Sequence, residues 1–249
     1  MSAFGVLSAL FHAAGAACAD TAEIDWFDAR LPQAAGPVLE LMCGTGRVLV
    51  PLVKRGLHVH GVDRSAAMIA ACESRLAEEQ CSTPLFRQPL GSLNLPFRYA
   101  AAYCAGGSFQ HLPDPLSAVE ALRRVRAHLI PPALLLLDLT VPIAAAHPPG
   151  APLVEVRSVT LADGTRIAAR SELVIEPDSR RLEVRTRFER RVGTRVTQRE
   201  DQLVTRTWYS EEEAIEMVSG AGFIDSRIGE PARTPAGDRG FTLTARASG

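Results

Sequence analysis

The stretch VLELMCGTGR, residues 38–47, decides the fold together with VHGVD, residues 59–63. An apolar strand runs into a turn with two glycines, a helix follows, and a second apolar strand ends in a carboxylate. This order predicts the first half of a nucleotide-binding α/β unit. Asp63 follows Glu40 by 23 residues, which places its carboxylate where it can accept hydrogen bonds from both hydroxyls of a ribose.

The glycine turn also indicates which kind of nucleotide is bound. A dinucleotide site reads G-x-G-x-x-G and holds a pyrophosphate at the helix start, whereas this chain has Gly44 and Gly46 but Leu49 at the third position. Glu40, near the strand end, would repel an anionic ligand and can hold a cationic one. The residues therefore favour a nucleoside that carries an ammonium and a sulfonium over a strand-to-helix turn with no ligand.

At these residues the chain resembles the class I S-adenosylmethionine-dependent methyltransferases, whose first motif commonly has an acidic residue shortly before Gly-x-Gly. The resemblance covers roughly Ile24 to Arg246. It implies an α/β fold, with a Rossmann-like seven-stranded sheet, helices on both faces and an antiparallel β insert, and it implies S-adenosyl-L-methionine as the cofactor. The expected cofactor contacts are Glu40, Cys43, Gly44, Gly46, Asp63, Arg64, Met68, Gln88, Leu90 and Ala105.

The expected adenine end of this site departs from the family pattern. The family usually places an Asp after the third strand, whereas residues 87–90 read Arg-Gln-Pro-Leu. Gln88 could supply a side-chain carbonyl to the adenine amino group instead, and Leu90 could pack on the ring. This departure keeps a methyltransferase-like protein that binds without catalysing as an alternative.

Two residues are candidates for catalysis. His111 lies in the segment CAGGSFQHL, residues 104–112, which follows the fourth strand at the edge where open α/β sheets bind ligands. Its ordinary pKa suits a general base, and the other interpretation is that it only caps a turn. Asp138, at the end of a leucine-rich strand, could orient an amine or simply accept backbone amides.

Alternating helices and strands give way to an antiparallel segment. We expect a single domain over 24–249 with a β insert at about 153–207, preceded by an N-terminal helical segment over 1–23. The apolar run from Ser2 to Ala19 predicts an amphipathic helix that packs on the domain, with a secretion signal or a mis-assigned start as alternatives. The expected strands are 38–42, 58–62, 85–88, 100–105, 133–139 and 241–245, and the expected helices are 24–31, 48–55, 65–79, 116–128 and 210–218.

One face of the insert carries alternating charges, Glu183, Arg185, Arg187 and Glu189. A solvated sheet face is the favoured interpretation, and a subunit interface or a substrate cover is the alternative. A homodimer through the insert is therefore one partner expectation.

Composition limits the remaining function classes. The net charge of −1 and the pI of about 6.6 argue against nucleic-acid binding through general basicity. Five cysteines without C-x-x-C spacing argue against a disulfide framework and a zinc site, so we expect no bound metal and a cytoplasmic location. No stretch is apolar and long enough to predict a membrane span.

The combined expectation is methyl transfer from S-adenosylmethionine to a small molecule, at nitrogen more than at oxygen. A non-catalytic binding protein and a protein or RNA methyltransferase that uses the Arg-rich strands are the alternatives. The mixed signs of charge on those strands speak against the last.

Overall fold

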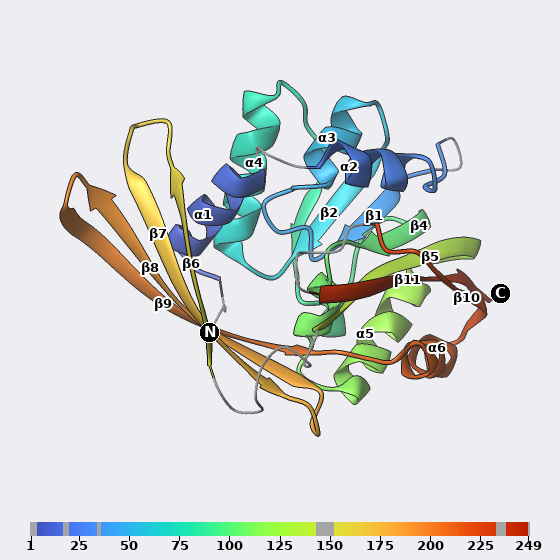
Figure 1. The fold of residues 1–249 in the computed structure, drawn as a ribbon. Helices are drawn as coiled ribbons and strands as arrows, with labels where there is room; N and C mark the ends of the chain where they lie inside the picture. The colour runs from blue at the N-terminus through green and yellow to red at the C-terminus, as the bar shows by residue number, and fades with distance from the viewer. Residues whose placement is uncertain (1–3, 17–19, 34–35, 143–151, 233–237, 249) are drawn as a thin grey trace.

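Two β-sheets of different construction make up the computed structural model, which describes residues 4–16, 20–33, 36–142, 152–232 and 238–248. The larger sheet has seven strands in the order β10-β11-β5-β4-β1-β2-β3, and the smaller has four in the order β6-β7-β8-β9 (Figure 1). The seven-stranded methyltransferase sheet and the antiparallel insert are thus both confirmed.

The seven-stranded sheet is parallel from β3 to β5 and closes with an antiparallel pair. β11 runs antiparallel to both β5 and β10. β5 is longer than expected and begins at Leu129 instead of Ala133. Its strands are β1 (Val38–Leu41), β2 (Val59–Asp63), β3 (Leu85–Arg87), β4 (Tyr99–Cys104), β5 (Leu129–Pro142), β10 (Phe223–Gly229) and β11 (Asp238–Ala247).

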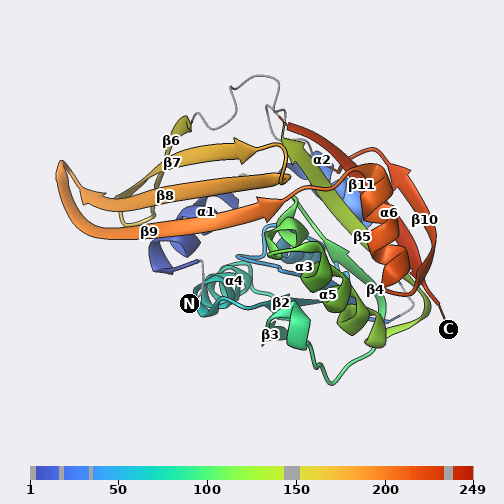
Figure 2. The same cartoon turned by 90° about the horizontal axis from the view of Figure 1, so that it is seen from below.

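Helices cover both faces of this sheet because its buried strands present apolar side chains to each side. On β5, Leu135 and Leu137 pack in one core with α5 (Pro115–Ala127) and α6 (Glu211–Gly220), whereas Leu136 packs in the other. Figure 2 shows α5 and α6 beside one another on their face. The second core includes α2 (Thr21–Asp28), α3 (Leu49–Lys54) and α4 (Ala66–Glu78).

The helix starts follow from local capping chemistry. Ser65 Oγ accepts a hydrogen bond from Met68 N at 3.3 Å and begins α4, as expected. Ser210 and Glu213 form a reciprocal capping box at the start of α6. Both helices therefore begin where the sequence places them.

The insert is a four-stranded meander that stands to one side of the larger sheet (Figure 1). The N-terminal helix α1 (Val6–Ala16) packs on its inner face and on α4, so the expected helix is present, while residues 2–3 and 17–19 of the expected range lie outside the described residues. Phe11 contacts Phe188 with ring centroids 5.5 Å apart. The strands are β6 (Leu153–Thr160), β7 (Arg166–Glu176), β8 (Arg181–Val192) and β9 (Arg195–Thr207).

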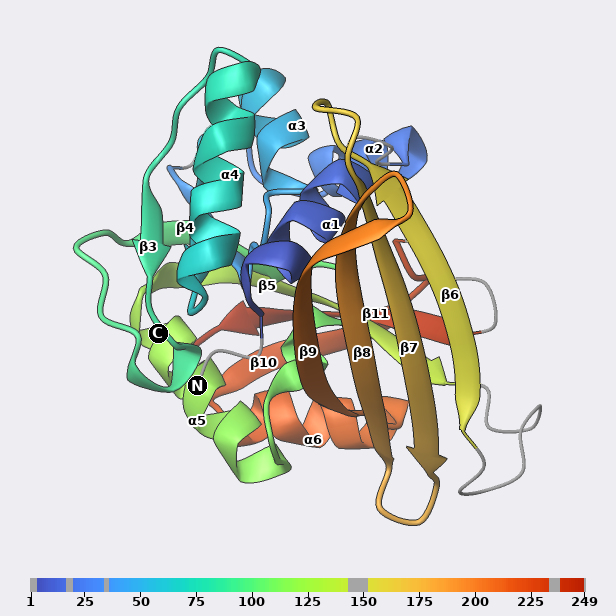
Figure 3. The same ribbon diagram turned by 90° about the vertical axis from the view of Figure 1, so that its left-hand side faces the viewer.

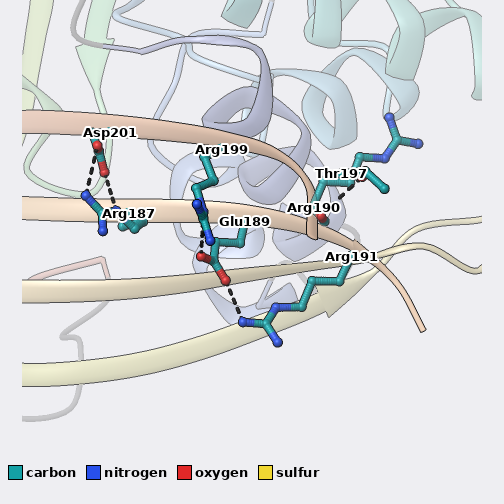
Figure 4. A network of polar contacts seen from close by, with 7 residues as sticks. All are labelled: Arg187, Glu189, Arg190, Arg191, Thr197, Arg199 and Asp201. Atoms are coloured by element: carbon teal, nitrogen blue, oxygen red, sulfur yellow. Dashed lines mark hydrogen bonds and ion pairs between the residues drawn. The ribbon is translucent and has the colours of Figure 1, made fainter. Parts of the chain in front are cut away.

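The outer face of the insert is polar and largely satisfied within itself (Figure 4). Arg187 binds Asp201 at 2.7 Å, and Glu189 binds Arg191 and Arg199 at 2.5 and 3.0 Å. Exposed pairs of this kind contribute little stability. Their mutual pairing supports the interpretation of the charged strand pattern as a solvated face.

Candidate functional site

A cavity of about 540 Å³ lies at the carboxyl ends of β1, β2 and β4. This is the edge at which open α/β sheets bind ligands. The walls come from the strand ends and the segments that follow them, while Phe4, His12 and residues 203–205 of β9 contribute from the N-terminus and the insert. Parts of the chain that are far apart in sequence therefore line one cavity.

Backbone amides fix the carboxylate of Asp63 at the cavity. Its Oδ2 accepts from Gly44 N at 3.0 Å and its Oδ1 accepts from Ser65 N at 2.8 Å. Burial raises the pKa of Asp63 and these two bonds oppose that shift. Each carboxylate oxygen has a second acceptor site, so the side chain can still accept from a pair of hydroxyls such as those of a ribose.

The two glycines of the turn have different roles. Gly44 (φ +55°) lines the cavity and has no neighbouring atom within 4 Å of the place where a Cβ would stand. Gly46 (φ +74°) does not line the cavity, and a Cβ there would lie 2.6 Å from Cys72 Sγ of α4. Gly46 therefore lets α4 approach the turn, and its contact with a ligand stays a prediction.

Glu40 is the buried acid of the cavity. Burial raises its pKa to about 8, and Tyr103 Oη donates to its Oε2 at 2.7 Å. Arg47 also lines the cavity and forms an ion pair with the buried Glu23. A carboxyl group held near its titration point would gain from a positively charged ligand, as the sequence indicated.

The adenine end differs from the expectation. Gln88 lines the cavity, but its Oε1 accepts from Asn94 N at 2.8 Å and its Nε2 donates to Asn94 O at 3.0 Å. The carbonyl that was expected to meet an adenine is thus engaged with the chain itself. Leu90 and Met68 are buried and line the cavity, which leaves packing on a ring open to both.

Three further residues that the sequence predicts to contact the cofactor lie at the cavity. Cys43, Arg64 and Ala105 all line the cavity. Cys43 and Ala105 are buried, whereas Arg64 is exposed.

His111 faces the cavity from the short 3-10 helix η2 (Ser108–His111). Its ring meets the Phe4 ring edge to face, with centroids 5.9 Å apart. Burial lowers the pKa of His111 to about 3, assisted by the charge of Arg206 and opposed by a backbone hydrogen bond with Thr205. Its Nδ1 is buried and has no hydrogen-bond partner among the described residues. The imidazole is therefore neutral at physiological pH and has a nitrogen available to a ligand.

Asp138 does not line the cavity. Its Oδ2 accepts from Gly106 N at 3.0 Å and its Oδ1 from Ala232 N at 3.3 Å, and burial raises its pKa to about 6. Of the two roles considered from the sequence, these contacts match acceptance of backbone amides. Asp138 thereby holds the turn that leads from β4 to His111.

The sequence did not indicate that the N-terminal segment would contribute Phe4 and His12 to the cavity. Ser65 Oγ donates to Phe4 O at 3.0 Å, and Glu200 of β9 accepts from Leu7 N and Ser8 N at 2.9 and 3.1 Å. These contacts tie the segment to both sheets. Its apolar composition signalled packing but gave no information on which surface it would cover.

The described residues also show a second hollow, but no metal-binding cluster and no membrane-spanning helix. A second hollow of about 610 Å³ lies beside residues 91–98 and the end of α5, away from the strand ends, so we assign the chemistry to the smaller cavity. No cluster of three or more His, Cys, Asp or Glu residues in the described ranges could hold a metal ion. None of the described helices has the length and apolar character needed to cross a bilayer.

Comparisons with known proteins agree with this geometry. Residues 38–131 match a family model described as a methyltransferase domain. A ubiquinone biosynthesis O-methyltransferase of Pseudomonas savastanoi pv. phaseolicola is 29% identical over 105 residues, which cover 41% of this chain and 44% of that protein. The matched stretch spans less than half the length of the curated relatives.

Two solved structures share the fold over almost the whole chain. An S-adenosylmethionine-dependent methyltransferase from Clostridium acetobutylicum superimposes with a TM-score of 0.73 at 16% identity, covering 94% of each chain. The sugar N-methyltransferase KedS8 from Streptoalloteichus sp. superimposes with a TM-score of 0.71 at 22% identity, covering 91% of this chain and 87% of that one. The comparisons thus show a methyltransferase-domain match over residues 38–131 and, over almost the whole chain, the fold of solved S-adenosylmethionine-dependent methyltransferases.

Proposed function

We propose that this protein transfers a methyl group from S-adenosylmethionine to a small-molecule amine. One observation carries the proposal: a neutral imidazole with an unpartnered nitrogen, His111 Nδ1, faces the same cavity as Glu40 and Asp63. The cavity volume of about 540 Å³ lies in the range typical of small-molecule sites. Closure by α1 and β9 favours a small acceptor over a protein or RNA chain.

Some residues of the cavity would bind the cofactor, and another would orient the acceptor amine. Asp63 and Gly44 would hold the ribose and Glu40 the positively charged end of the cofactor. When bound, the cofactor supplies a sulfonium methyl carbon, so that a nitrogen–carbon bond forms as the carbon–sulfur bond breaks. His111 Nδ1 would accept a hydrogen bond from an N–H of the neutral amine and aim the amine lone pair at the methyl carbon, and the proton of the methylated ammonium would leave to solvent. Because the pKa of His111 is lowered to about 3, the imidazole stays neutral throughout the neutral range and can accept this hydrogen bond.

Nitrogen is preferred over oxygen for a chemical reason. A group with a pKa of about 3 is too weak a base to deprotonate an alcohol ahead of attack, whereas a neutral amine attacks with its own lone pair and needs no base before attack. The sugar N-methyltransferase with this fold supports an amino sugar as the first acceptor to test. The four free cysteines among the described residues, Cys43, Cys72, Cys81 and Cys104, fit a cytoplasmic location.

The test pairs binding with turnover. Isothermal titration should show binding of S-adenosylhomocysteine, and radiolabelled methyl should move to an amino sugar but not to the matched sugar with a hydroxyl at that position. His111→Gln should lower kcat about 100-fold or more with unchanged affinity for S-adenosylhomocysteine, while the control His58→Gln, just before β2 and outside the cavity lining, should change neither.

A second candidate function is binding without methyl transfer. It is favoured by the engagement of Gln88 with Asn94, which occupies one of the two acceptor sites of the carbonyl expected to meet adenine. S-adenosylhomocysteine binding with no transfer to any amine or alcohol in a broad acceptor panel would support this candidate. Absence of binding would overturn both proposals.

A further inference from the structure

β6 forms one edge of the insert and has a single described neighbour, β7. Figure 3 shows it at the border of the four-stranded sheet. The backbone groups along a sheet edge are free to pair with another strand, and proteins commonly protect such edges with charge or proline. Here the strand interior exposes two valines, Val154 at 46% and Val156 at 70%.

The pairing register assigns the side chains of β6 to two faces. Val159 lies opposite Ile167 and packs with it against α1, so residues 153, 155, 157 and 159 share the inner face. Val154, Val156 and Ser158 therefore share the outer face. The charged side chains Glu155 and Arg157 lie on the inner face, are 41% and 69% exposed, and pair with each other within the strand at 3.5 Å, a contact that an opposing strand can exchange for direct cross-strand pairs.

The sequence of β6 is complementary to itself when the strand is turned around. With a two-fold axis at Val156, antiparallel pairing places Glu155 opposite Arg157 of the second copy and Arg157 opposite Glu155 of the second copy. Leu153 then meets Val159 of the second copy, and the two Val156 side chains meet at the axis. Opposite charges and apolar pairs that face one another directly across strands stabilise a sheet.

We propose that two copies of this chain associate edge to edge through β6, antiparallel about Val156, to form a continuous eight-stranded sheet from the two inserts. The charges that would protect a lone edge become attractive in this one register. The interface is isologous, as expected for a two-fold dimer. A single strand pair buries less than the roughly 1,200 Å² of a standard interface, so the association should depend on concentration in the micromolar range.

Charge reversal tests both the surface and the register. We expect sedimentation velocity of the full chain, from about 1 to 100 μM, to show a monomer–dimer equilibrium. Glu155→Arg places arginine opposite arginine twice in each dimer and should raise the dimer Kd about tenfold or more. The double variant Glu155→Arg/Arg157→Glu restores opposite charges at both pairs and should return the Kd to within about threefold of the original.

Two controls complete the experiment. Arg123→Glu, at an exposed position of α5, should leave the Kd unchanged. Val156→Cys should form a disulfide-linked dimer on mild oxidation because the two residues meet at the axis, whereas Val192→Cys, exposed on β8, should not. A monomer at every concentration, or single reversals that leave the dimer intact, would overturn the proposal. Failure of the double variant to recover while Val156→Cys still cross-links would overturn the charge register.

Discussion

At the carboxyl edge of β1 and β2, backbone amides hold Asp63, and the residues that bond are close in sequence: Asp63 and Ser65 are two positions apart, and Gly44 and Asp63 are nineteen apart. The insert is held to α1 quite differently. Glu200 reaches Leu7 N across 193 positions, and Phe188 packs on Phe11.

The contacts that are short-range in sequence and those that are long-range in sequence build two different parts of the same cavity. The short-range region is shaped for a nucleoside and can form whenever β1, its turn and β2 form. The long-range region supplies Phe4, His12 and β9, which cover the side where an acceptor would enter. The two regions should therefore respond differently to substitution.

The largest expected effect is a loss of stability in the insert and α1 that leaves the stability of the β1–β2 region unchanged. Phe188→Ala removes a ring that is 2% exposed from the core around α1, and such deletions cost about 3–5 kcal/mol. Hydrogen exchange should accelerate in α1 and β8 but not in β1, while Val192→Ala, at a position 56% exposed, should change little. Equal acceleration in β1 would show that the two regions unfold as one unit.

The next effect lies within the glycine turn. Gly46→Ala should cost about 2–4 kcal/mol of unfolding free energy, because the positive φ and the contact with Cys72 Sγ both oppose a Cβ. Gly44→Ala should cost about 1–2 kcal/mol, since only its positive φ opposes the change. Thermal and urea unfolding measure both values, and equal losses would mean that α4 does not press on the turn.

The third effect concerns the affinity of the cavity for S-adenosylhomocysteine. Asp63→Ala should weaken S-adenosylhomocysteine binding by about 1–3 kcal/mol, the scale for leaving polar partners unpaired. Asp178→Ala, in the exposed turn between β7 and β8, is the matched control. Isothermal titration decides the question, and an unchanged affinity would place the ribose elsewhere.

The last effect, small within any one pH unit, is a dependence of stability on pH. The pKa of Glu40 is raised from 4.5 to about 8 by burial, so between these values the folded chain keeps a proton that the unfolded chain releases. The unfolding free energy should therefore fall as pH rises through this window, by at most about 1.4 kcal/mol per pH unit. Glu40→Gln should flatten the slope in urea titrations, and an unaltered slope would assign it to other groups.

Local chemistry explains which predictions from the sequence succeeded. The capping residues Ser65 and Ser210, the alternation of strands and helices, and the spacing of Asp63 all depend on neighbours within a few residues or on one βαβ unit. The orientation of Gln88 could not be predicted in this way. Its choice of Asn94 as partner depends on how residues 88–94 turn back on themselves.

The sequence by itself determined the β1–turn–β2 half of the cavity, because glycine conformations, strand periodicity and a carboxylate at a fixed spacing are local properties. Only the tertiary structure decided that Gly46 serves α4, that Asp138 holds a turn, and that the N-terminus and β9 cover the cavity with His111. These outcomes depend on contacts between segments that are distant in sequence. Such contacts are determined by close packing and by the hydrogen bonding of buried groups in the folded chain.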